Sequence, residues 1–147
     1  MKPTPLIKEV IIHAPATDVW KAITDKDEMK RWYFDLEEFK PETGFEFSFY
    51  GEGSKGEKYL HLCRITEVIP GKKLSHSWRY EGIPGISYLT FELFNEGDNT
   101  RLVLTHDGLE TFATDSPDFK KESFSAGWNE ILNTNLKNYL ESKKNSN

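Results

Sequence analysis

The chain has 147 residues, of which 37% are hydrophobic and 29% charged, and this composition predicts one soluble globular domain and excludes a disordered chain. Its formal net charge of −5 argues against nucleic acid as a partner, because phosphate binding requires an excess of Lys and Arg on one face. A single cysteine, Cys63, excludes an internal disulfide and every zinc site built on several cysteines.

The first part of the chain predicts one strand followed by two short helices. A run of β-branched residues over Leu6–His13 favours a strand. Pro15 suits the first position of a helix, because its missing N–H costs nothing there. Asp25 is expected to end this helix and to cap a second, shorter one. Met29 and Trp32 are spaced to form the buried face of that second helix.

The middle of the chain changes to a period-two pattern and predicts five strands. Between residues 44 and 50 the odd positions are Phe after the first glycine, which indicates a strand with one aromatic face. Four more strands are expected, separated by turns rich in Gly, Pro, Asn and Asp. Their expected ranges are Glu57–Ile69, Leu74–Tyr80, Ile86–Phe94 and Thr100–His106.

A long amphipathic helix is predicted near the C-terminus. Apolar residues from Phe124 to Tyr139 recur at helical spacing, with charged residues off that face. Two starting points stay open, at Ser116-Pro117 or at Ser123. The tail, residues 143–147, is expected to fray.

This order of elements predicts an α+β fold in a single domain over residues 1–147, with a core at about residues 6–142. Strands that are kept apart from the helices favour an antiparallel sheet of about six strands. Such a sheet and one long helix can bury each other only if the sheet curves around the helix. Because no apolar segment resembles a secretion signal or a membrane span, we expect a cytoplasmic protein.

Short motifs follow one another along the chain in a recognisable order. They are Ala14-Pro15, Val19-Trp20, Ala22-Ile23-Thr24-Asp25, Trp32, Pro41-Glu42-Thr43-Gly44, Glu67-Val68, Trp78, Thr90-Phe91-Glu92-Leu93, Thr100–His106 and Gly127-Trp128. No single motif is specific, but the ordered set, which covers about residues 6–140, resembles the START-like proteins of the SRPBCC superfamily. Within it, the chain is most similar to the AHSA-type branch, named after the activator of the heat-shock-protein-90 ATPase.

The resemblance implies a helix-grip fold, in which a curved sheet and the last helix enclose an elongated cavity. Members of the superfamily bind lipids, polyketides and other apolar small molecules, and a minority catalyse cyclisation or dehydration. The chain departs from the family at Gly44-Phe45, where two glycines are common. It also has no room for the separate N-terminal domain of the eukaryotic co-chaperones, which weakens a chaperone-activator hypothesis.

Aromatic rings and histidines are the expected lining of that cavity. The predicted ligand-cavity residues are Phe47, Phe49, His76, Trp78, Phe91, His106, Trp128 and Leu132. The expected ligand is an apolar, lipid- or polyketide-like molecule, and no cofactor is implied. The alternative is that these rings only pack the core, as aromatic stripes usually do.

Two residues are weak candidates for acid–base chemistry. If the hairpin turns at Pro70-Gly71, then Glu67 and His76 lie opposite or diagonal to each other on one face of the sheet. A carboxylate beside an imidazole is the smallest general acid–base pair. The alternative is a cross-strand hydrogen bond near the hairpin end.

A metal site is not predicted. His61, Cys63 and His76 could supply three ligands in principle, but their spacing matches no recognised metal motif. We expect Cys63 to be a buried structural thiol and not a nucleophile.

Three functions therefore stay open. The first is a carrier or sensor of an apolar small molecule. The second is an enzyme of the cyclase or dehydratase kind that uses Glu67 and His76. The third is an interaction protein that acts on a chaperone or another partner through its surface. An open interior would favour the first two hypotheses, and a filled interior the third.

Overall fold

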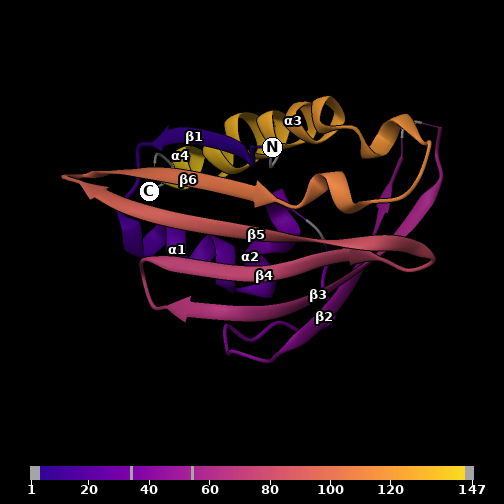
Figure 1. Ribbon diagram of the computed structural model, residues 1–147. Coiled ribbons are helices and arrows are strands. Elements are labelled where there is room, and N and C mark those ends of the chain that lie inside the picture. Colours follow the sequence, from indigo (N-terminus) through magenta and orange to yellow (C-terminus); the bar gives the residue numbers. More distant parts are fainter. Residues whose placement is uncertain (1–3, 34, 54, 145–147) are drawn as a thin grey trace.

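The computed structural model describes residues 4–33, 35–53 and 55–144, which form one antiparallel sheet with helices against one of its faces (Figure 1). The six strands are β1 (Leu6–Ile12), β2 (Glu46–Glu52), β3 (Lys58–Ile69), β4 (Lys73–Tyr80), β5 (Ile83–Glu96) and β6 (Asn99–Asp107). They are hydrogen-bonded in the order β1-β6-β5-β4-β3-β2, so β1 and β2 are the edges. The predicted α+β fold with a curved antiparallel sheet is confirmed.

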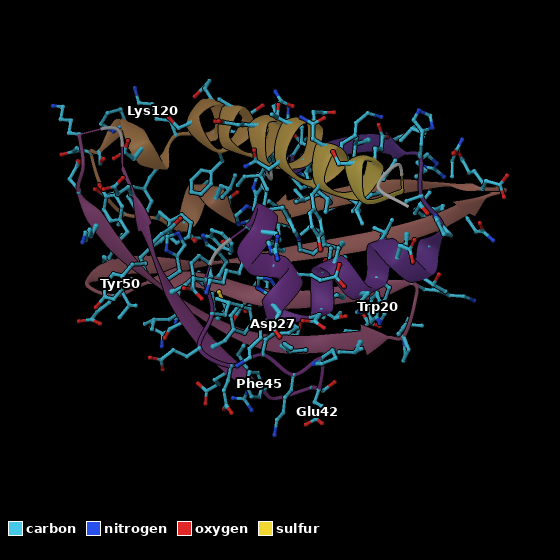
Figure 2. All side chains as sticks on the ribbon, turned by 180° about the vertical axis from the view of Figure 1, so that it is seen from behind. Trp20, Asp27, Glu42, Phe45, Tyr50 and Lys120 are labelled. Carbon is cyan, nitrogen blue, oxygen red and sulfur yellow. The ribbon has the colours of Figure 1, made fainter. Side chains whose placement is uncertain are left out.

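The helices form the second layer. They are α1 (Ala16–Thr24), α2 (Lys26–Trp32), α3 (Lys121–Asn129) and α4 (Lys137–Lys144), with short 3₁₀ turns η1 (Leu109–Thr111) and η2 (Pro117–Phe119). A π-helical segment, η3 (Glu130–Leu136), joins α3 to α4, so that the three form one C-terminal helix. Seen from behind, the C-terminal helix and the α1–α2 pair cover the same face of the sheet (Figure 2). Within the described ranges, no helix is long and apolar enough to cross a membrane.

The core lies between the helices and the concave face of the sheet. Alternate strand residues point into it, as on β5, where Leu89, Phe91 and Leu93 are buried. Leu132 and Leu136 of the C-terminal helix are fully buried on the opposite side of this core. The predicted helix-grip arrangement follows, because the sheet can bury its apolar face only by wrapping around that helix.

Asp25 separates the first two helices, as the sequence predicts. Its carboxylate accepts hydrogen bonds from the backbone N–H groups of Asp27 (2.9 Å) and Glu28 (3.4 Å), which caps α2. The indole N–H of Trp32 donates to the carbonyl oxygen of Ala22 at 3.0 Å. This buried bond holds the end of α2 against α1 and fixes the ring of Trp32.

The C-terminal helix begins at Lys121 and not at either of the two predicted starts. Ser116 instead caps η2, where its hydroxyl accepts a hydrogen bond from the backbone N–H two residues later. Ser123 lies inside the first turn of α3 and donates to the carbonyl oxygen of Pro117 at 2.8 Å. The helix continues to Lys144, and the rest of the tail predicted to fray, residues 145–147, lies outside the described residues.

At Gly85, β5 packs closely against the segment that follows β6. The sequence predicts a loop over residues 81–85, but β5 already begins at Ile83. Gly85 has a φ of +121°, and a Cβ atom on it would lie 2.4 Å from the carbonyl oxygen of Thr111. Only glycine permits both the backbone angle and this contact.

We therefore expect Gly85→Ala to lower the free energy of unfolding more than Gly97→Ala does. Gly97 also has a positive φ, +72°, but no atom lies within 4 Å of an added Cβ, so its substitution costs only the backbone strain, roughly 1–2 kcal/mol. At Gly85 the clash adds roughly another 1–3 kcal/mol. Urea denaturation of both variants measures the difference, and equal losses would contradict the close approach.

Candidate ligand-binding site

The eight predicted ligand-cavity residues meet in the interior, where none is more than 9% exposed. They come from β2 (Phe47, Phe49), β4 (His76, Trp78), β5 (Phe91), β6 (His106) and the C-terminal helix (Trp128, Leu132). The structure therefore brings together eight side chains that are spread over residues 47 to 132 of the sequence.

The ring of Trp78 lies at the centre of the aromatic contacts in this interior. Its ring centre lies 5.7 Å from that of Phe49, 4.9 Å from that of His61 and 5.6 Å from that of Trp128. Several of the contacts are edge-to-face, an arrangement that adds to the stability of the fold beyond the effect of burying the rings. The aromatic faces of the sheet and the helix are thus interlocked through Trp78.

His106 uses both of its ring nitrogens within the protein. The indole N–H of Trp128 lies 3.1 Å from Nδ1, and because an indole can only donate, Nδ1 accepts and the proton is on Nε2. Nε2 lies 2.8 Å from the hydroxyl oxygen of Ser87, which in turn donates to the carbonyl oxygen of Trp78. A ligand can therefore contact only the carbon atoms of the His106 ring, unless one of these hydrogen bonds is broken.

His76 is different, because only one of its nitrogens is used. Nδ1 lies 2.9 Å from the carbonyl oxygen of Ser77, which can only accept, so Nδ1 carries the proton and Nε2 is an acceptor. Within the described part of the chain, no hydrogen bond reaches Nε2, although the side chain is 3% exposed. His76 therefore offers a hydrogen-bond acceptor on a side chain that is largely buried.

His61 and Cys63 are further polar side chains of this interior, which the sequence analysis did not include among the cavity residues. His61 stacks on Phe49 with ring centres 4.5 Å apart, and its Nδ1 lies 3.0 Å from the carbonyl oxygen of Tyr59. Burial raises the pKa of the Cys63 thiol, which keeps it protonated and unreactive. Among the residues that the structure describes, no group of three or more His, Cys, Asp or Glu side chains is placed to hold a metal ion.

The predicted pairing of Glu67 with His76 is wrong. A β-bulge at Thr66 shifts the register of β3 against β4, so that His76 lies opposite Ile65 whereas Glu67 lies opposite Ser75. The extra residue turns Glu67 to the outer face of the sheet, where it forms an ion pair with Lys73 at 3.0 Å. The carboxylate and the buried imidazole are therefore on opposite faces and cannot exchange a proton directly.

Among the described residues, a small void lies in the interior between the sheet and α2. Its volume is about 10 Å³, which is about the room one water molecule needs. His76, Phe47 and Phe91 border it from the sheet, and Trp32 and Tyr33 border it from the end of α2. The elongated cavity that the resemblance implies is therefore closed in this structure.

Tyr33 is one of the side chains that close the interior. Its ring centre lies 6.1 Å from that of Phe49 and 6.2 Å from that of Trp128, so it lies between the sheet and the C-terminal helix. Burial raises the pKa of its hydroxyl, which stays protonated. Tyr33 was not predicted as an interior residue, because it follows α2 directly and belongs to no periodic pattern.

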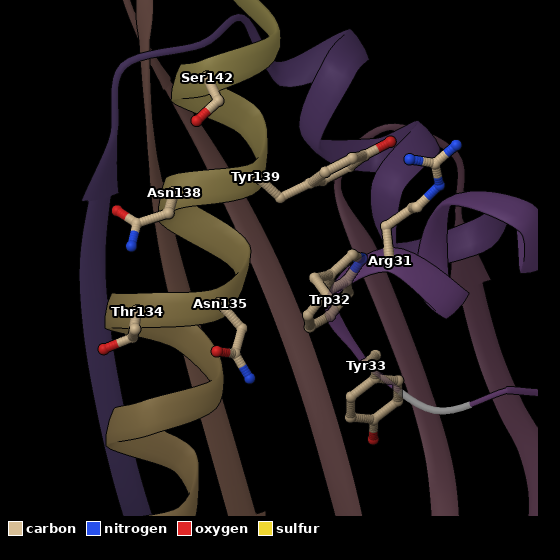
Figure 3. Close-up of a pocket in the computed structure, with 8 residues that line it drawn as sticks. All are labelled: Arg31, Trp32, Tyr33, Thr134, Asn135, Asn138, Tyr139 and Ser142. Carbon is tan, nitrogen blue, oxygen red and sulfur yellow. The ribbon is translucent and has the colours of Figure 1, made fainter.

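A groove of about 800 Å³ lies on the other side of the same rings (Figure 3). Arg31, Trp32 and Tyr33 line it from α2 and its end, and Asn135 and Tyr139 are among the residues that line it from the C-terminal helix. Trp32 and Tyr33 stack with ring centres 4.8 Å apart and at 22°. These two rings thus form the wall between the outer groove and the inner void.

The buried histidines predict a stability that falls in mild acid. Burial lowers the pKa of His61 and of His76 to about 4 and that of His106 to about 3, from an ordinary value of 6.5. Between pH 6.5 and pH 4, the three histidines are protonated in the unfolded chain but neutral in the native protein, so the unfolded chain binds up to three more protons. The free energy of unfolding therefore decreases as the pH falls through 6.5 toward 4, by up to about 4 kcal/mol per pH unit.

Urea denaturation at a series of pH values between about 7.5 and 5 measures this dependence. We expect His76→Asn to reduce the number of protons taken up on unfolding by about one. An unfolding free energy that is constant over this range would contradict the burial of three neutral histidines.

Comparison with known proteins places this site in a family. A family model described as Activator of Hsp90 ATPase homolog 1-like protein matches residues 13–141. Comparison with the curated proteins gave no match.

Among solved structures, the protein CV1439 from Chromobacterium violaceum is 20% identical with a TM-score of 0.79, over 95% of this chain and 98% of that one. CalU16 from Micromonospora echinospora is 27% identical with a TM-score of 0.72, over 95% of this chain and 78% of CalU16. DynU16, a protein of the dynemicin biosynthetic locus, is 21% identical with a TM-score of 0.77 over 96% of this chain, which spans 48% of DynU16. Because the family model covers most of its length, the chain belongs to the Activator of Hsp90 ATPase homolog 1-like family, an AHSA-type branch of the SRPBCC superfamily.

Proposed function

We propose that the protein binds an apolar small molecule between the sheet and the C-terminal helix and acts as a carrier or sensor of it. The observation that carries this proposal is the imidazole of His76, which borders the void and whose Nε2 is an acceptor that no hydrogen bond among the described residues reaches. A ligand with one hydroxyl or N–H group could donate a hydrogen bond to this atom.

Binding requires that the interior open, because the void of about 10 Å³ cannot hold such a ligand. Tyr33 follows the last residue of α2, and its ring forms part of the wall between the void and the outer groove. Movement of the Tyr33 ring would join the void to the outer groove. We therefore propose Tyr33 as the side chain that a ligand displaces.

The relatives support a role in small-molecule binding. DynU16 belongs to a biosynthetic locus, and CalU16 has the same fold over most of its length. The lining residues are also the kind that binding pockets use, with many aromatic rings and few polar groups. A catalytic role is not proposed, since the acid–base pair that would have carried it is separated by the sheet.

Titration with N-phenyl-1-naphthylamine tests the proposal. This probe is apolar, fluoresces strongly only outside water and carries one N–H donor that matches Nε2 of His76. We expect saturable one-to-one binding in roughly the micromolar range, with energy transfer from the buried tryptophans.

The variant His76→Leu should weaken this binding by about fivefold, because it removes the acceptor and keeps an apolar side chain. His13→Leu, at an exposed position, is the matched control and should bind like the wild type. Absence of saturable binding would contradict the proposed function, and equal affinity in His76→Leu would contradict the role of the imidazole.

A second candidate function, interaction with a chaperone, is favoured by two observations. The interior is almost filled, and the outer face of the sheet exposes large apolar side chains, among them Ile7 (59%), Tyr50 (66%) and Tyr88 (48%). The ATPase rate of an Hsp90 chaperone, measured with and without the protein, tests this candidate. A rate that rises with added protein and falls back in Tyr88→Ser would favour it over ligand binding.

A further inference from the structure

We propose that the groove between α2 and the C-terminal helix binds the charged head of the ligand, so that the natural ligand is an amphipathic organic anion. Its apolar part would enter the interior past Tyr33, and its head would stay in the groove against Arg31. This inference rests on the proposed function and adds the chemical class of the ligand.

The position of the groove is the first argument. The groove and the inner void share one wall, which consists of the stacked rings of Trp32 and Tyr33. A molecule that displaces Tyr33 therefore extends from the interior directly into the groove. The groove volume of about 800 Å³ lies within the range of small-molecule sites.

The charge of the groove is the second argument. Arg31 is exposed at its edge, and within the described ranges its guanidinium forms no ion pair or hydrogen bond. The carboxylate of Glu28, one turn earlier on α2, accepts a hydrogen bond from Tyr139 at 3.0 Å and pairs with Lys21 at 3.5 Å. In a chain with a net charge of −5, a cation left without a partner beside a groove favours an anionic ligand.

The backbone of the C-terminal helix is the third argument. Thr134 and Asn135 belong to the π-helical segment η3, and such segments occur most often at functional sites. Figure 3 shows the amide of Asn135 on the side of the helix that faces Tyr33, whereas Thr134 points to the other side. The amide therefore lies on the groove side of the helix, where it can donate a hydrogen bond to a bound molecule.

Two probes with the same skeleton separate the head from the apolar part. 1-Anilinonaphthalene-8-sulfonate differs from N-phenyl-1-naphthylamine only in its sulfonate. We expect Arg31→Gln to weaken binding of the sulfonate probe by roughly five- to tenfold and to change binding of the neutral probe less than about twofold. In the wild type, salt should weaken binding of the sulfonate probe only.

Lys30→Gln is the matched control, because Lys30 is exposed on the same helix, carries the same charge and does not line the groove. It should leave both affinities unchanged within about twofold. Equal weakening of the sulfonate probe in both variants would overturn the inference, since the effect would then be one of net charge. The inference would also be overturned if the neutral probe binds but Arg31→Gln binds the sulfonate probe as tightly as the wild type does. This result would leave the proposed function standing. If the wild type binds neither probe, both proposals fail.

Discussion

The interior depends on one chain of hydrogen bonds, which runs from Trp128 through His106 and Ser87 to the backbone of Trp78. It joins the C-terminal helix to β6, β5 and β4, and it places each proton unambiguously. Because every member is satisfied, the chain stabilises the fold without leaving a buried polar atom, and it holds Trp128 and Trp78 in contact. The aromatic interior is assembled around these two rings.

His76 lies in the same interior but outside that chain, and this contrast is the basis of the functional account. In the proposed function, a ligand displaces the ring of Tyr33, which lies between the closed interior and the outer groove. Binding would exchange contacts of the Tyr33 ring for contacts of the ligand, at a cost that lowers the observed affinity.

Local patterns made much of the fold predictable from the sequence. The period-two strands, the cap at Asp25 and the apolar face of the last helix each depend on neighbouring residues, and all three are found in the structure. The family motifs supplied the remaining step, the wrapping of the sheet around the helix. Eight interior residues could be named for the same reason, since each lies on the apolar face of its own element.

The sequence-based predictions were wrong or incomplete where a single residue shifts the register between two strands or fills part of the interior. The bulge at Thr66 reverses the direction of Glu67, and no composition or spacing in this hairpin indicates it. Tyr33 fills the interior from a position beyond a helix end, and the π-helical turn at Asn135 has no sequence signal in the periodicity of that helix. These features depend on packing between distant segments, which periodicity does not report.

Native mass spectrometry of gently purified protein tests the central claim most directly. The account predicts a stoichiometric adduct that dissociates on unfolding and that proves, after extraction, to be an organic acid with a large apolar part. Protein that shows only its own mass, and that remains so after incubation with a lipid and organic-acid extract, would contradict the claim that this interior opens for a ligand.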